Sequence, residues 1–173
     1  MKKQQIHPFP PVYDECSEIL ILGSFPSVKS REENFFYGHP RNRFWKVTSA
    51  VFGEAVPRTV GEKKAFLLRK RIALWDVIAS CEIEGSADST IGNVLPNDLS
   101  VILASAPIRA IFVNGRTAEK YYRLYSEKTT GREAVCLPST SPANAARSLD
   151  DLIRAWQVIA SPAFSQKKPE NRK

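Results

Sequence analysis

The sequence predicts an α/β domain in which a parallel sheet of four strands is covered by helices on both faces. Short apolar runs alternate with amphipathic stretches of helix length, an order that is typical of this fold class. The apolar runs lack the two-residue alternation of a half-exposed strand, so each strand is expected to be buried on both sides. The predicted strands are residues 18–23, 71–76, 110–114 and 133–137.

Helices are predicted in the gaps between these strands. Residues 43–52 place Phe44, Val47 and Val51 on one helical face, and Gly53 follows as a stop signal. The remaining predicted helices are residues 62–70, 97–105, 117–125 and 148–160, with Asn97 and Ser148 as N-caps.

The length of 173 residues fits one domain, which we place at residues 1–164. Residues 1–13 are rich in proline and have few periodic apolar positions, which predicts an extended lead-in on the domain surface. Residues 165–173 are basic and carry no large apolar side chain, so we expect a disordered basic tail there.

The composition favours a polyanionic partner such as nucleic acid. Lys and Arg total 25 against 18 Asp and Glu, a net charge of +7 at pH 7. No apolar run is long enough for a membrane span and no signal sequence follows Met1, so we expect a cytoplasmic monomer. The three cysteines lie too far apart for a zinc or iron–sulfur motif, and we expect neither a metal nor a cofactor.

Polar loops follow the predicted strands, and in an open parallel sheet ligands bind at the carboxyl ends of the strands. The first loop, residues 23–27 (GSFPS), suits an anion because a glycine admits close backbone approach and a proline stiffens the turn. It matches neither the dinucleotide nor the triphosphate motif. An ordinary strand-to-loop turn explains it equally well.

Residues 34–45 combine three consecutive aromatic side chains with two arginines that flank the amide of Asn42. Aromatic rings beside a basic cleft can stack on an extruded base, and arginines can meet phosphates. The alternative is structural: Phe35 and Phe36 belong to the core, the arginines are solvated, and Asn42 caps the helix that follows.

The run at residues 37–47 (YGHPRNRFWKV), with Gly23 and Pro26 before it and residues 137–141 (LPSTS) far downstream, resembles the uracil-DNA glycosylase superfamily. The order and spacing are most similar to its mismatch-specific branch and to the DNA-deoxyinosine (hypoxanthine-DNA) glycosylases. This resemblance implies a three-layer α/β/α fold and a monofunctional enzyme of base excision repair. Such an enzyme flips a deaminated base out of DNA and hydrolyses its N-glycosidic bond, with hypoxanthine preferred and uracil or xanthine possible.

The resemblance also implies roles for individual residues. Uracil-cleaving members carry Asp or Asn at the position of Phe25, so the deoxyinosine-cleaving pattern implies that Asn42 orients the attacking water. Tyr37 would stack on the flipped base. Related enzymes have a base-reading amide at the position of Asp76; a carboxylate there either accepts N1–H of hypoxanthine or N3–H of uracil, or is simply a solvated residue at a strand end. The implied base-binding residues are Ser24, Phe25, Pro26, Ser27, Tyr37, Asp76 and Ser139, and the implied DNA-backbone residues are Arg41, Arg43, Thr140, Ser141, Ala143 and Asn144.

Several alternatives stay open. Asn114 and Arg116 either touch the base or phosphate or simply belong to a turn, and a structural hydrogen bond explains His39 as well as catalysis does. Phe25 and Ser139 stand where catalytic groups are expected, so a DNA- or RNA-binding module that lost the chemistry is the second hypothesis. A hydrolase of free nucleotides is disfavoured because the sequence shows no acidic metal-binding cluster.

Overall fold

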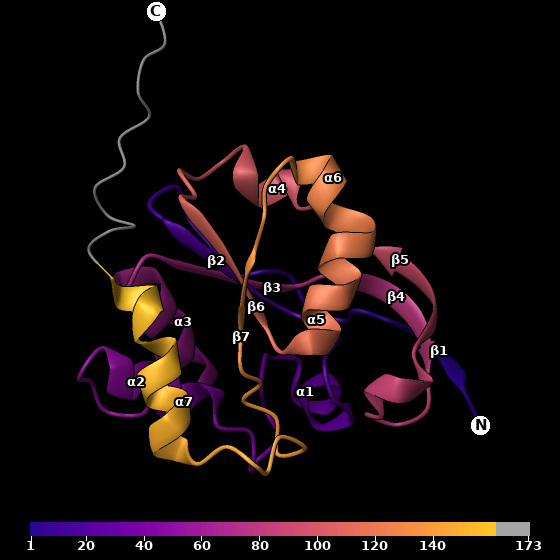
Figure 1. The fold of residues 1–173 in the computed structure, drawn as a ribbon, viewed down its shortest axis with the longest axis horizontal. Helices are drawn as coiled ribbons and strands as arrows, with labels where there is room; N and C mark the ends of the chain where they lie inside the picture. The colour runs from indigo at the N-terminus through magenta and orange to yellow at the C-terminus, as the bar shows by residue number, and fades with distance from the viewer. Residues whose placement is uncertain (162–173) are drawn as a thin grey trace, which may run out of the picture.

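The computed structural model describes residues 1–161, and a four-stranded parallel sheet lies at its centre (Figure 1). Its strands stand in the order β3 (Ile72–Asp76), β2 (Ile19–Gly23), β6 (Ala110–Asn114) and β7 (Val135–Leu137). The four predicted strands are therefore confirmed. The prediction that every strand is buried on both sides is wrong for β7. Val135 is 44% exposed, because this short strand forms an edge of the sheet.

Helices cover both faces, which confirms the three-layer α/β/α fold (Figure 1). One face packs against α2 (Phe44–Val51), α3 (Val60–Arg69) and α7 (Leu149–Trp156). The other packs against α4 (Ser100–Leu103), α5 (Arg116–Tyr121) and the π-helical turn Tyr122–Ser126, which leads into α6 (Glu127–Thr130). Successive residues of β2 alternate between the two cores, as the geometry of a strand requires.

Local capping explains several helix starts. Thr59 and Glu62 form a capping box at α3, and the Ser148 hydroxyl accepts from Asp151 N at 3.1 Å at the start of α7, as predicted. The prediction for Asn97 is wrong. Its Nδ2 donates to the carbonyls of Asp76 and Ile78 at 2.9 and 3.2 Å, so it ties the end of β3 to the next strand, and α4 begins only at Ser100.

The sequence prediction missed a second, three-stranded antiparallel sheet of order β1-β4-β5. Its strands are β1 (Lys3–Ile6), β4 (Ile78–Ile83) and β5 (Gly92–Pro96), with a 3-10 turn at Asp88–Thr90 between the last two. Only Val77 separates β3 from β4, so the two strands merge into one apolar run in the sequence. β1 is largely polar, and its pairing with β4 joins residues about 80 positions apart.

The lead-in is extended as predicted, but it does not simply lie on the surface. Phe9 and Val12 are each only 7% exposed and belong to the core, and Val12 pairs with Leu74 of β3. α1 (Val28–Glu33) directly follows the first loop. Among the helices of residues 1–161, none has the length and hydrophobicity that a bilayer span needs. The predicted tail at 165–173 lies outside the described residues.

Candidate active site

A cavity of about 420 Å³ lies at the carboxyl ends of the central strands, where the sequence analysis expected a ligand. Its walls come from the loops after β2, β3, β6 and β7, from the segment before α2 and from the β4–β5 connection. The structure thus brings together most of the predicted site residues, namely Ser24, Phe25, Pro26, Ser27, Tyr37, Asn42, Asp76, Ser139, Thr140, Ser141 and Ala143. Arg41, Arg43 and Asn144 do not line the cavity itself.

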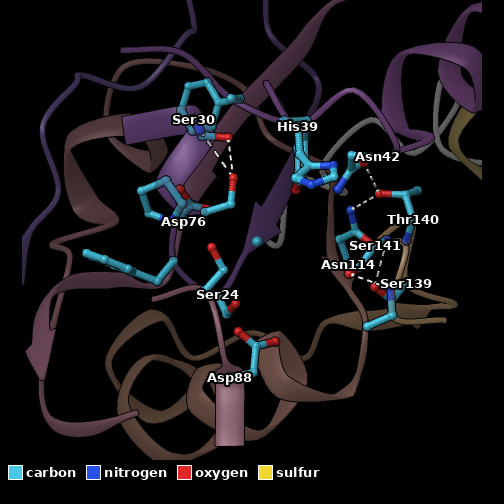
Figure 2. A pocket seen from close by; sticks show the side chains of 18 of the residues that line it. Ser24, Ser30, His39, Asn42, Asp76, Asp88, Asn114, Ser139, Thr140 and Ser141 are labelled. Atoms are coloured by element: carbon cyan, nitrogen blue, oxygen red, sulfur yellow. Dashed lines mark hydrogen bonds between the residues drawn. The ribbon is translucent and has the colours of Figure 1, made fainter. Parts of the chain in front are cut away.

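Asn42 is held by hydrogen bonds that determine which way its amide points. Its Oδ1 accepts from the backbone N–H of Phe44 at 3.0 Å and from the Thr140 hydroxyl at 2.9 Å. A flipped amide would set its NH2 group against the Phe44 N–H, so the carbonyl must face the helix. The N-cap position of α2 is Arg43, so the prediction that Asn42 caps this helix is wrong; Asn42 lies one residue earlier and accepts from the first helical N–H. Figure 2 shows the nitrogen end of the amide on the side of His39.

A hydrogen-bond chain from β6 fixes this arrangement (Figure 2). Asn114 Nδ2 donates to Thr140 Oγ1 at 2.9 Å, so the Thr140 hydroxyl hydrogen is left for Asn42 Oδ1. Asn114 Oδ1 also accepts from Thr140 N at 3.1 Å. Thr140 is fully buried. Asn114 is therefore the clamp that orders Thr140 and Asn42, a role that the Asn-Gly pattern in the sequence did not indicate.

Tyr37 packs one face of its ring on Phe44, with ring centroids 4.1 Å apart and planes inclined by 19°. Its backbone adopts a positive φ of 52°, an unusual conformation for an aromatic residue. The hydroxyl is buried without a hydrogen bond of good geometry to residues 1–161. Burial raises the pKa of the Tyr37 phenol, the charge of Asp76 raises it further, and the nearby amide of Asn114 lowers it. The phenol is thus an uncharged group in the cavity wall.

The first loop is braced by serine hydroxyls and by an aromatic ring. Ser27 caps α1 by accepting from Ser30 N at 3.2 Å, and the Ser30 hydroxyl accepts from Gly38 N at 2.9 Å. This links the loop after β2 to the segment that carries Tyr37. Phe25 is only 8% exposed and packs in the core, with the Arg31 guanidinium 5.6 Å from its ring. Phe25 therefore supports the cavity wall with an apolar ring and offers no group that could bind water.

Asp76 forms a buried pair with His7, a residue that the sequence analysis left without a role. His7 Nε2 lies 2.7 Å from Asp76 Oδ2, and the two side chains are 4% and 5% exposed. Asp76 Oδ1 lies against Gly23: a β-carbon at Gly23 would sit 2.3 Å from this oxygen and 3.0 Å from the Tyr37 hydroxyl. Glycine is therefore required at this position by the side chains around it.

Asp88, which no sequence pattern indicated, enters the cavity wall from the β4–β5 connection (Figure 2). Asp88 as a whole residue is exposed, but its carboxyl group lies on the side of the cavity (Figure 2). Desolvation there raises the pKa of Asp88, the Thr117 hydroxyl lowers it, and the charge of Asp76 raises it. Within residues 1–161, no group of three or more His, Cys, Asp and Glu side chains is arranged to hold a metal ion.

Arg43 holds the loop after β7 in place. Its guanidinium donates to the carbonyls of Asn144 and Ser141 at 2.9 and 3.3 Å and also to that of Arg147. Within the loop, Asn144 Nδ2 donates to Ser139 O at 2.9 Å. These contacts commit Arg43 and Asn144 to shaping the loop, and their contact with DNA remains a prediction. Arg41, by contrast, is exposed.

Residues 10–160 match the model of the Uracil DNA glycosylase superfamily. This chain belongs to that superfamily. The chain is 44% identical over 138 residues to a hypoxanthine DNA glycosylase of Methanosarcina acetivorans, covering 79% of this chain and 86% of that protein. A hypoxanthine DNA glycosylase of Methanosarcina barkeri is 36% identical over 158 residues, which are 90% of this chain and 96% of that protein.

A solved structure shows the same superfamily fold. It is a solution NMR structure of a candidate uracil DNA glycosylase from Methanosarcina acetivorans, 37% identical to this chain, with a TM-score of 0.73. The match covers 88% of this chain and 97% of that one. The family resemblance predicted from the motifs is therefore confirmed over most of the chain, including the middle region where the motifs are weakest.

The two arginines before α2 should behave differently, because Arg43 donates to the loop after β7 and Arg41 is exposed. Arg43→Met is expected to lower the free energy of unfolding by about 1–3 kcal/mol, because three carbonyls lose a charged donor. Thermal unfolding and amide hydrogen exchange across residues 141–147 measure this effect.

Arg41→Met is the matched control. Because Arg41 is exposed, this change should leave stability and exchange unaltered. If Arg41 contacts a phosphate, the Arg41→Met variant should release about one counterion fewer on binding DNA, which the salt dependence of the affinity measures. Equal effects of both changes on hydrogen exchange would contradict the clamp role of Arg43.

Proposed function

We propose that the protein is a monofunctional DNA glycosylase of base excision repair that removes hypoxanthine from DNA. The observation that carries this proposal is the hydrogen-bond chain from Asn114 through Thr140 to Asn42, which holds one amide rigidly in a cavity beside an aromatic ring. The names of the two relatives from Methanosarcina support the choice of hypoxanthine.

In this mechanism, Asn42 holds the attacking water through Nδ2. Both acceptor positions of its carbonyl oxygen are already used by Phe44 N–H and Thr140, so the amide N–H group is what remains for a water oxygen. An amide is no proton acceptor of useful strength. It acts by position, because the sugar carries oxocarbenium-like charge when the base departs and needs only a weak nucleophile at C1′.

The flipped base would lie between Tyr37 and the first loop. The Tyr37 ring, supported from behind by Phe44, provides a stacking surface, and Asp76 provides an acceptor for the lactam N–H. Donors around Ser24, Ser27 and Ser139 would hold the departing purine anion. Flipping costs least for a mispaired base, which adds selectivity for deaminated sites.

A substrate panel tests the proposal. Duplexes with a single deoxyinosine, deoxyuridine, deoxyxanthosine or deoxyadenosine are incubated with the protein and then treated with alkali, which breaks the strand at abasic sites. We expect cleavage at deoxyinosine after alkali and none before it, because no lysine of residues 1–161 lines the cavity to form a Schiff base. Borohydride trapping should yield no covalent complex. Absence of abasic product from every deaminated base would overturn the proposal.

The second candidate function is a nucleic-acid-binding module without catalysis. It is favoured by Phe25, whose ring packs in the core, and by Ser139, whose hydroxyl accepts from Ser141 N at 3.1 Å. Salt-dependent binding to all duplexes with no abasic product would select this function.

A further inference from the structure

We infer that His7 is a positioning residue that makes Asp76 an obligate hydrogen-bond acceptor, and that the pair thereby admits lactam bases and rejects adenine and cytosine. This role rests on the proposed glycosylase function. His7 follows β1, in the segment of the chain that carries none of the family motifs, and reaches the cavity wall only because β1 pairs with β4.

The surroundings of His7 determine which nitrogen carries its proton. Its ring is enclosed by the rings of Phe9, Phe25 and Phe36, with centroids 4.6, 6.1 and 6.1 Å away. Nδ1 is buried without a hydrogen-bond partner among residues 1–161, whereas Nε2 faces Asp76 Oδ2 at 2.7 Å. A proton on Nδ1 would leave a buried N–H unpaired and bring the lone pair of Nε2 against a carboxylate. The proton therefore sits on Nε2.

This bond leaves the other carboxylate oxygen for the cavity. With Oδ2 accepting from His7, Asp76 Oδ1 lies on the side of Gly23 and the Tyr37 hydroxyl. A carboxylate in this position can only accept. Hypoxanthine, xanthine and uracil present a lactam N–H, whereas adenine N1 and cytosine N3 present lone pairs, which a carboxylate oxygen repels. Guanine also has a lactam N–H, and its exclusion must come from the cost of unpairing it.

Exchanging Asp76 for asparagine turns this arrangement into a test of His7. In Asp76→Asn the Nε2–H of His7 donates to the amide oxygen of the new asparagine. The NH2 group of that amide must then point into the cavity. A donor then meets the base, which favours adenine over hypoxanthine. If His7 is also changed to phenylalanine or glutamine, nothing fixes the amide, because phenylalanine has no polar group and a glutamine amide can present either end.

The experiment measures the affinity of full-length variants for non-cleavable duplexes that carry 2′-fluoroarabino hypoxanthine or adenine opposite an abasic analogue. Neither base then has to be unpaired from a partner. Wild-type protein is expected to prefer hypoxanthine by about tenfold or more, as a single donor–acceptor mismatch predicts. Asp76→Asn should invert that preference, and adding His7→Phe or His7→Gln should bring it to within about threefold of equality.

Two single variants complete the set. His7→Gln alone retains a donor toward Asp76 and should keep the wild-type preference. Ile6→Ala, on the adjacent β1 residue that is 72% exposed, should change nothing. Because His7→Gln preserves the hydrogen bond, the test stands even if His7→Phe does not fold.

The outcomes separate the two proposals. An inverted preference in Asp76→Asn that persists unchanged when His7 is replaced would overturn the role of His7 and leave the glycosylase proposal intact. The same holds if Asp76→Asn keeps the wild-type preference. A wild-type protein that shows no preference for hypoxanthine and no cleavage of deoxyinosine overturns the proposed function.

Discussion

Replacing Asn42 with alanine is expected to lower the rate of base removal about 100-fold or more, because the amide N–H group proposed to hold the attacking water is lost. The same change removes the side-chain acceptor of the Phe44 N–H at the first residue of α2. That loss should lower the free energy of unfolding by about 1 kcal/mol. Single-turnover cleavage of a deoxyinosine duplex and thermal unfolding measure the two effects separately.

Two variants separate the effect of Asn42 on the rate of base removal from its effect on stability. Asn42→Asp keeps an oxygen for the Phe44 N–H and for the Thr140 hydroxyl but has no N–H to hold a water. It should therefore fold, and base removal should become slower, because the free carboxylate oxygen can hold the water only as an acceptor and so changes its orientation. Ser148→Ala removes the N-cap hydrogen bond of α7, outside the cavity, and should lose about 1 kcal/mol of stability with activity unchanged. Full activity in Asn42→Ala would exclude the assigned role.

Exchanging Gly23 for alanine is expected to be the most damaging small substitution in the cavity. The added β-carbon would lie 2.3 Å from Asp76 Oδ1 and 3.0 Å from the Tyr37 hydroxyl. The backbone of β2 tolerates alanine, so the entire effect is steric and falls on the proposed base-reading oxygen and stacking ring. We expect a loss of about 1–3 kcal/mol of stability and about 100-fold or more in deoxyinosine cleavage.

Gly61→Ala serves as the matched control for this change. Gly61 lies in α3, and its added β-carbon would approach only Thr59 Oγ1, at an ordinary 3.9 Å. Alanine there should stabilise the helix by up to about 1 kcal/mol and leave activity as it is. If Gly23→Ala cleaved deoxyinosine at the wild-type rate, the positions assigned to Asp76 and Tyr37 would be wrong.

Much of the architecture follows from local sequence patterns. Uninterrupted apolar runs identify β2, β3 and β6 because a central parallel strand must be apolar on both faces. The helical spacing of apolar residues before Gly53 identifies α2, and the serine before α7 identifies the start of that helix. The polar residues at the ends of these strands converge on one cavity for the same topological reason, which is why most of the predicted site residues line it.

The second sheet escaped prediction because it depends on pairing between distant segments. β1 is polar and exposed along most of its length, and only hydrogen bonds to β4 make it a strand. Its position decides that His7 lies beside Asp76 and that Phe9 enters the core. No periodicity within residues 1–13 contains that information.

The sequence by itself determined the fold class, the family and most of the side chains that line the cavity, because these depend on local apolar patterning and on contiguous motifs. Only the tertiary structure decided what each polar group is free to do. Asn42 shows the difference: its carbonyl is occupied by Phe44 and Thr140, and its N–H group remains. Thr140 lies 98 residues from Asn42 in the chain, and only folding brings the two side chains together.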